Sequence, residues 1–233
     1  MELAYATPAG VHARLIGDAW VFLDITRDRY FCLTGEPARQ YAELIGSPAA
    51  GRLSQRASSL AERLTAKGLL TITKTAPVSG HKHEVIAFRG ALNDEGAPQD
   101  EAIDLVDIAR FAREFLVCAP LRDPRKRNLA KTVEDVKALK AKTQGRPREN
   151  LRCASSLTRS FQNIAPWFYS AHDACFFSSL LLVRFLAQSG ILADWVFGVR
   201  LSPFQAHCWV AHEGLILNED SLIVAGFDPI LVV

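Results

Sequence analysis

The chain has 233 residues, of which 49% are hydrophobic and 22% charged, and this balance is typical of a globular protein with a full core. A net charge of +2 gives no reason to expect a nucleic-acid partner. No apolar run approaches the roughly 20 residues that span a bilayer, and no signal peptide is apparent, so we expect no membrane partner. Five cysteines at wide spacings, without a metal-ligand pattern, predict a reduced cytoplasmic protein with no metal and no cofactor.

The first eighty residues predict a small domain in which strands precede helices. Short strand patterns occur three times, at 12–16, 19–24 and 29–33. Two helical patterns and a closing strand follow, at 37–45, 57–67 and 69–73. This order is typical of a winged-helix-like domain, which we assign to residues 1–75.

The rest of the chain predicts a linker and a second domain. Residues 76–100 combine Pro, Gly and scattered charges with little periodicity, as a linker does. Four helical patterns follow, at 103–115, 133–142, 153–164 and 175–188. Three strand patterns then close the chain, at 193–199, 205–211 and 215–219. The fold class is therefore α+β, with a second domain over residues 101–233.

Chemically active residues gather in the second domain. Cys175 heads an apolar helix, His207 lies on a strand pattern, and the acids Glu219 and Asp220 close the next strand pattern. A Cys can act as nucleophile, a His can carry its proton, and an acid can orient the His. A helix N-terminus also favours the thiolate form of a Cys. This order is the layout of a papain-like or transglutaminase-like thiol site.

The third member of the site can be either acid. If Glu213-Gly214 forms a two-residue turn, His207 pairs with Asp220 across the two strands and Glu219 points away. A one-residue bulge would reverse the choice in favour of Glu219. We prefer Asp220 on this register argument.

Each residue also has a structural interpretation. Cys175 alone is more typical of a buried thiol, and His207 alone of a core histidine. The two together, with an acid in reach, favour a catalytic site. Cys208 follows His207 directly and is therefore expected to pack on the opposite face of the strand. The simplest interpretation of Cys32 and Cys118 is that they are core residues.

The second domain resembles the B protein of lasso-peptide biosynthesis, a leader peptidase with a transglutaminase-like fold. The motifs that carry the resemblance lie between about residues 151 and 220. They are Cys175-Phe-Phe-Ser-Ser-Leu180, Gly190-Ile191, Val196-Phe-Gly-Val199, His207-Cys-Trp-Val210 and Leu217-Asn218-Glu219. The chain departs from the family at Ser178, where an Arg is common. The family often places its acid directly after an Asn, which favours Glu219.

The first domain resembles the leader-recognition domain related to the pyrroloquinoline-quinone chaperone. The resemblance rests on Trp20, Leu23-Asp24, the segment Tyr30-Phe-Cys-Leu-Thr-Gly35, and Gly68-Leu-Leu70. It implies that the leader of a precursor peptide docks there as an added strand. We name five candidate contacts, for which a core role is an equal alternative: Tyr30, Phe31, Leu33, Leu60 and Leu64.

Together these resemblances imply a cysteine peptidase that hydrolyses the bond between the leader and the core of a ribosomally made precursor peptide. Its partners would be that precursor and a separate ATP-dependent lasso cyclase. Two other interpretations stay open. One is a thiol acyltransferase or transglutaminase on the same scaffold. The other is a non-catalytic module that delivers the peptide.

Overall fold

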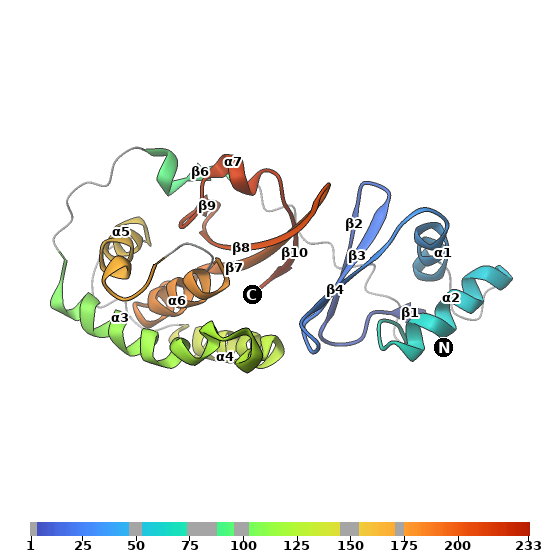
Figure 1. The fold of residues 1–233 in the computed structure, drawn as a ribbon, viewed down its shortest axis with the longest axis horizontal. Coiled ribbons are helices and arrows are strands. Elements are labelled where there is room, and N and C mark those ends of the chain that lie inside the picture. The colour runs from blue at the N-terminus through green and yellow to red at the C-terminus, as the bar shows by residue number, and fades with distance from the viewer. Residues whose placement is uncertain (1–3, 47–52, 74–87, 96–102, 145–153, 171–174) are drawn as a thin grey trace. The chain divides into compact units, whose positions relative to one another are not determined.

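The computed structural model has a mixed α+β fold and describes residues 4–46, 53–73, 88–95, 103–144, 154–170 and 175–233 (Figure 1). The chain divides into two compact units, residues 1–85 and 86–233. Residues 90–95, which we predicted to lie in the linker, belong to the second unit, because Gly90 and Ala91 pair with a strand near the C-terminus.

The first unit contains five strands and two helices among its described residues. They are β1 (Ala4–Ala6), β2 (Val11–Ile16), β3 (Ala19–Asp24), β4 (Arg29–Leu33), α1 (Gly35–Gly46), α2 (Gln55–Ala66) and β5 (Thr71–Thr73). The strands β2, β3 and β4 form an antiparallel sheet in that order, and β1 pairs with β5. These strands and helices agree closely with the predicted ones, apart from β1, which we did not predict.

The helices of the first unit pack on one face of the three-stranded sheet. Phe22 of β3 meets the ring of Tyr41 of α1 edge-on, with ring centroids 4.9 Å apart. Three predicted leader contacts, Leu33, Leu60 and Leu64, are buried in this same core. Because these side chains are covered by other residues of the first unit, they are core residues, which was the alternative interpretation. Tyr30 and Phe31, on β4, are only half-buried.

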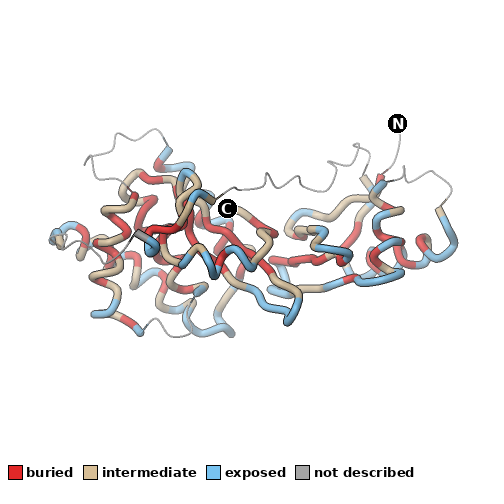
Figure 2. The backbone as a smooth tube through the Cα atoms, turned by 90° about the horizontal axis from the view of Figure 1, so that it is seen from above, coloured by how far each residue is buried: buried red, intermediate tan, exposed pale blue. Residues whose placement is uncertain are grey.

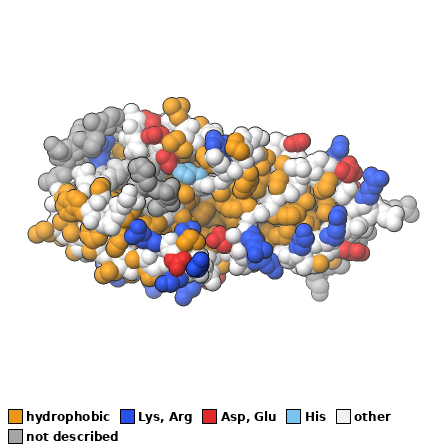
Figure 3. Space-filling model, viewed as in Figure 1, with side chains coloured by type: hydrophobic (Ala, Val, Ile, Leu, Met, Phe, Trp, Pro, Cys, Tyr) orange, Lys and Arg blue, Asp and Glu red, His pale blue; other side chains and the backbone are white. Residues whose placement is uncertain are grey.

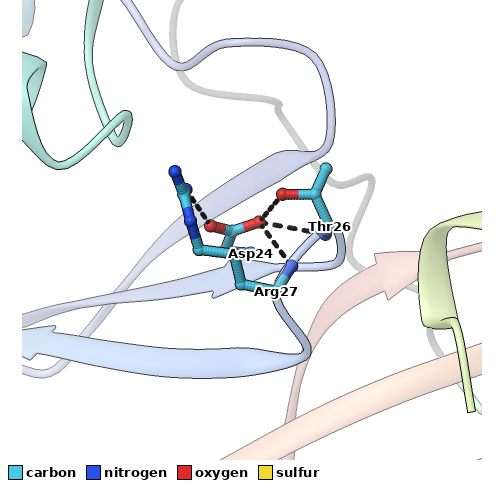
Figure 4. Close-up of polar contacts among 3 residues, drawn as sticks. All are labelled: Asp24, Thr26 and Arg27. Carbon is cyan, nitrogen blue, oxygen red and sulfur yellow. Dashed lines mark hydrogen bonds and ion pairs between the residues drawn. The ribbon is translucent and has the colours of Figure 1, made fainter.

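The turn from β3 to β4 is held by one buried carboxylate (Figure 4). Asp24 accepts hydrogen bonds from the Thr26 backbone and hydroxyl and from the Arg27 backbone, and its other oxygen lies 2.7 Å from the Arg27 guanidinium. Burial raises the pKa of Asp24, but these hydrogen bonds outweigh it and leave the pKa below its usual value. The turn therefore fixes where β4, the outer strand, begins.

The second unit is built from a five-stranded sheet and a layer of helices. Its helices are α3 (Leu105–Cys118), α4 (Leu129–Thr143), α5 (Ala154–Ile164), α6 (Cys175–Gln188) and α7 (Ser221–Val224). Its strands are β6 (Gly90–Ala91), β7 (Asp194–Leu201), β8 (Phe204–His212), β9 (Leu215–Ile216) and β10 (Asp228–Val232). The long helices and β7 and β8 were predicted, whereas β6, α7 and β10 were not, and β9 is shorter than predicted.

The helix α6 lies at the centre of this unit. The sheet has the order β10-β7-β8-β9-β6, and α6 packs on β8 while α3, α4 and α5 surround its other sides. Nearly every residue of α6 after its first turn is buried, as its apolar sequence predicted. Figure 2 colours the backbone by burial and shows long buried stretches in both units. The opposite face of the sheet is covered around α7 by Trp209, Val224 and Phe227. Within the described residues, no helix has the length and apolarity needed to cross a bilayer.

Candidate active site

Two elements bring the predicted nucleophile and base together. Cys175 is the first residue of α6 and is exposed, and His207 lies in the first half of β8. The thiol of Cys175 and the imidazole of His207 lie close enough for each to shift the pKa of the other. This follows from the packing of α6 on β8, which sets the start of the helix beside the strand. One face of the molecule shows a histidine at the surface among acidic and hydrophobic side chains (Figure 3).

The acid that reaches His207 is Glu219. His207 Nε2 lies 2.6 Å from Glu219 Oε2, and both side chains are largely buried. Asp220 instead occupies the N-cap position of α7 and is exposed. The expectation that Asp220 faces His207 and Glu219 points away is therefore wrong.

The reason lies in how the chain leaves the sheet after β9. The two-residue turn forms as predicted, with His212 opposite Leu215. The backbone ladder ends soon afterwards, because the side-chain oxygen of Asn218 accepts the hydrogen bond from Val210 N–H at 2.7 Å. Because Val210 is bonded to the side chain of Asn218 and not to backbone, Glu219 no longer follows the alternation of the strand. Its side chain turns toward His207 instead.

The charges of the site favour an ion pair. Hydrogen bonds from Cys208 and His207 outweigh desolvation and lower the pKa of Cys175 to about 4. Hydrogen bonds to Cys175 and Glu219 outweigh burial and raise the pKa of His207 to about 9. Between these two values Cys175 is a thiolate and His207 an imidazolium, which is the resting state of a thiol nucleophile with its proton already transferred.

Aromatic rings enclose the imidazole. The ring of His207 lies against Phe227, with centroids 5.4 Å apart, and stacks on Trp209 at 6.2 Å. Gly198 is paired with His207 across the sheet, and a Cβ there would lie 2.6 Å from the Trp209 ring. The absent side chain at Gly198 thus leaves room for the Trp209 ring beside His207.

A buried polar network joins the three parts of the site. Ser179 Oγ donates to the carbonyl of Cys208 at 3.0 Å, and Asn218 Nδ2 donates to Ser179 Oγ at 3.0 Å. The network therefore ties the helix of Cys175 to the strand of His207 and to the loop of Glu219.

Sequence reasoning missed several residues of this site. Cys208 is buried, as expected, but it also lies close enough to Cys175 to lower the pKa of that thiol. Ser179 follows Cys175 by four residues, a spacing that places both on one helix face and could have indicated its role. Phe227 carried no signal, because its contact with His207 depends on the fold. Within the described residues, no cluster of His, Cys, Asp or Glu could hold a metal ion.

A comparison with protein families agrees with this geometry. Residues 116–232 match the model of the transglutaminase-like superfamily. The chain belongs to the transglutaminase-like superfamily. Members of this superfamily are typically cysteine-based enzymes and include both peptidases and transglutaminases. The matched range contains Cys175, His207 and Glu219. No curated protein and no solved structure matches the chain.

The ion pair predicts an unusual pH dependence for the reaction of Cys175 with iodoacetamide. Because only the thiolate reacts, and the pKa of Cys175 is about 4, alkylation at about pH 6 should already proceed at its plateau rate. Cys32, exposed on β4 with a raised pKa, should react much more slowly at that pH. Mass spectrometry of the alkylated peptides measures both rates, and equal rates would contradict the ion pair.

Proposed function

We propose that the protein is a cysteine peptidase that binds the leader of a ribosomally made precursor peptide and hydrolyses the leader–core bond during lasso-peptide maturation. The observation that carries the proposal is the contact series Cys175, His207 and Glu219 in a transglutaminase-like domain. The lasso-specific part rests on the resemblance of the motifs around Cys175 and His207, and of the first unit.

The chemistry needs no group beyond these side chains and water. The Cys175 thiolate attacks the carbonyl carbon of the last leader residue, and the Cys175 backbone N–H is placed to stabilise the oxyanion. The His207 imidazolium, held through Nε2 by Glu219, protonates the leaving amine of the first core residue. The neutral imidazole then takes a proton from water, whose oxygen attacks the thioester and releases the leader carboxylate.

An open strand edge beside the nucleophile can receive the peptide. The strand β9 pairs with β8 only at Ala211 and His212 among the described residues. Val210 N–H points away from β7 toward Asn218, so by strand alternation the N–H and C=O of Ala206 point the same way. Ala206 is exposed and directly precedes His207. A peptide laid along this edge would present its backbone to Cys175.

The first unit offers a second edge for the leader. The strand β4 pairs only with β3 among the described residues, and its side chains Tyr30 and Phe31 are half-buried. Phe31 lies 6.0 Å from the ring of Phe22, and Lys67 Nζ lies 5.0 Å from its centroid. An added leader strand would gain main-chain hydrogen bonds from β4 and an apolar contact from Phe31.

Leader binding should therefore depend on Phe31. We expect Phe31→Ala to raise the dissociation constant for a labelled leader peptide about tenfold, equivalent to roughly 1.4 kcal/mol, as measured by fluorescence anisotropy. The matched control is Leu15→Ala, which truncates an exposed hydrophobic side chain on β2, the opposite edge of the same sheet. Equal losses in both variants would count against docking at β4.

The proposal as a whole is tested by mass spectrometry. The purified protein is incubated with the precursor peptide encoded beside its gene, with and without the partner cyclase and ATP, and with an added primary amine. Leader-sized and core-sized fragments support the peptidase. A leader that carries the amine in place of a free carboxylate supports the transferase alternative. An intact precursor in every reaction, despite measurable binding, favours a delivery module.

A further inference from the structure

Arg200 lies on the same face of the sheet as His207. It is on β7, where it is paired with Gln205 of β8, and Gly198, two residues before it, is paired with His207. Residues two apart on a strand share a face, so Arg200 and His207 are diagonal neighbours on that face. Phe227 lies between them: its ring is 5.4 Å from the His207 ring and 5.1 Å from the guanidinium carbon of Arg200. The cation is therefore one ring away from the imidazole.

The guanidinium of Arg200 has no carboxylate partner among the described residues. Its Nη2 donates to the neutral amide oxygen of Gln205, and its buried Nε has no hydrogen-bond partner. By contrast, Arg184 of α6 lies 2.8 Å from the buried carboxylate of Glu114. Arg200 is half-buried, and a half-buried cation without a counter-charge gains more from an incoming anion than a fully solvated one does.

The neighbours of Arg200 hold its guanidinium in one position. Phe227 lies under it, Gln205 accepts from Nη2, and Nη1 lies beside Gly226, at 3.6 Å from where a Cβ would be. Gln205 accepts from only one of the N–H groups of the terminal nitrogens, so the others can serve a ligand. A guanidinium held in this way pairs well with a carboxylate, because little freedom is lost on binding.

We propose that Arg200 is a specificity-determining residue that binds a carboxylate of the peptide substrate close to the bond that is cleaved. The inference rests on the proposed function, which makes the substrate a peptide. The carboxylate belongs either to an Asp or Glu side chain near that bond or to the free C-terminus of the peptide, and it forms the same ion pair in both cases. No covalent bond changes at Arg200, so the residue contributes to recognition and not to the chemical steps.

The test compares the cleavage of a series of peptides by the wild-type protein and by Arg200→Gln. The series contains the precursor, versions in which one Asp or Glu at a time is replaced by its amide, and a version with an amidated C-terminus. In the wild type we expect one of these changes to lower kcat/KM about tenfold, because a charge-assisted hydrogen bond is lost. Arg200→Gln should cleave the precursor and that amide version at equal rates. The version that responds identifies the carboxylate.

The matched control is Arg113→Gln, which removes the same charge from an exposed position on α3 and should keep the wild-type preference. Arg200→Lys keeps the charge but not the planar fork, so it should retain part of the preference. A wild-type protein that cleaves every peptide at one rate would overturn the proposal. An Arg200→Gln variant that is slower on all peptides by one factor would also overturn it, because loss of packing on Phe227 alone predicts that result.

A second readout separates this inference from the proposed function. The same peptides are tested for their ability to protect Cys175 from iodoacetamide, which needs binding but no cleavage. If no peptide is cleaved, the proposed function fails. The inference still holds in that case if the acidic peptide protects at about tenfold lower concentration than its amide version in the wild type but not in Arg200→Gln. Cleavage without any charge preference would leave the proposed function standing and overturn the inference.

Discussion

The Cys175→Ala variant is expected to cleave no detectable precursor while it binds the leader as tightly as the wild-type protein. The Cys175 thiolate forms the acyl intermediate in the proposed mechanism, and removal of a nucleophile typically costs at least about 10⁴-fold in rate. The side chain is exposed at the first residue of α6, so its loss leaves the core of that helix intact. The measurement is a time course of fragment formation by mass spectrometry, with anisotropy for leader binding.

One control and two alternative outcomes make this experiment decisive. The control is Cys32→Ala, which removes another exposed thiol but keeps the β4 backbone and the Phe31 side chain that the leader is proposed to contact, and should cleave at the wild-type rate. Retained cleavage in Cys175→Ala would remove Cys175 from the mechanism altogether. Loss of leader binding together with cleavage would mean that the substitution disturbs more than the nucleophile.

The parts of the site that follow from hydrophobic periodicity were predictable. The helix over 175–188 was predicted with the bounds that the structure has, because an apolar run that ends at a Gly has few alternatives. The strand of His207 was predicted almost as well, since it carries Phe204, Trp209 and Val210 and a turn signal follows it. Periodicity alone therefore assigns the nucleophile to a helix and the base to a strand that follows it.

The parts that depend on single tertiary contacts were not predictable. The choice between Glu219 and Asp220 turns on one side-chain oxygen of Asn218 that replaces a backbone partner, and register arguments assume that the backbone ladder continues. The pairing of Gly90 and Ala91 with β9 joins segments more than a hundred residues apart, which no local pattern reveals. Cys208 was predicted to be a packing residue only. Strand alternation predicts the face on which a side chain lies, but it does not predict which residues cover that face.

Replacement of Glu219 is expected to have the second-largest effect on cleavage. Glu219→Ala should lower kcat/KM by roughly 10²- to 10⁴-fold, because His207 loses the carboxylate that orients it and supports its charge. Glu219→Gln should fall between this variant and the wild type, since an amide oxygen still accepts from Nε2 but carries no charge. Two neighbours raise the pKa of His207 to about 9: Cys175 has the larger effect, and Glu219 the next largest. The alkaline limb of the rate profile, where the imidazolium loses its proton, should therefore move to lower pH in both variants.

The neighbouring acid supplies the matched control for this prediction. Asp220→Asn removes a charge from the adjacent residue, an exposed N-cap whose side chain makes no capping hydrogen bond, and should change kcat/KM by less than about twofold. The two acids are adjacent in sequence, so a general effect of negative charge near the site would appear in both variants. A larger loss in Asp220→Asn than in Glu219→Gln would return the third role to Asp220. A wild-type alkaline limb in Glu219→Gln would show instead that Glu219 does not act through the charge of His207.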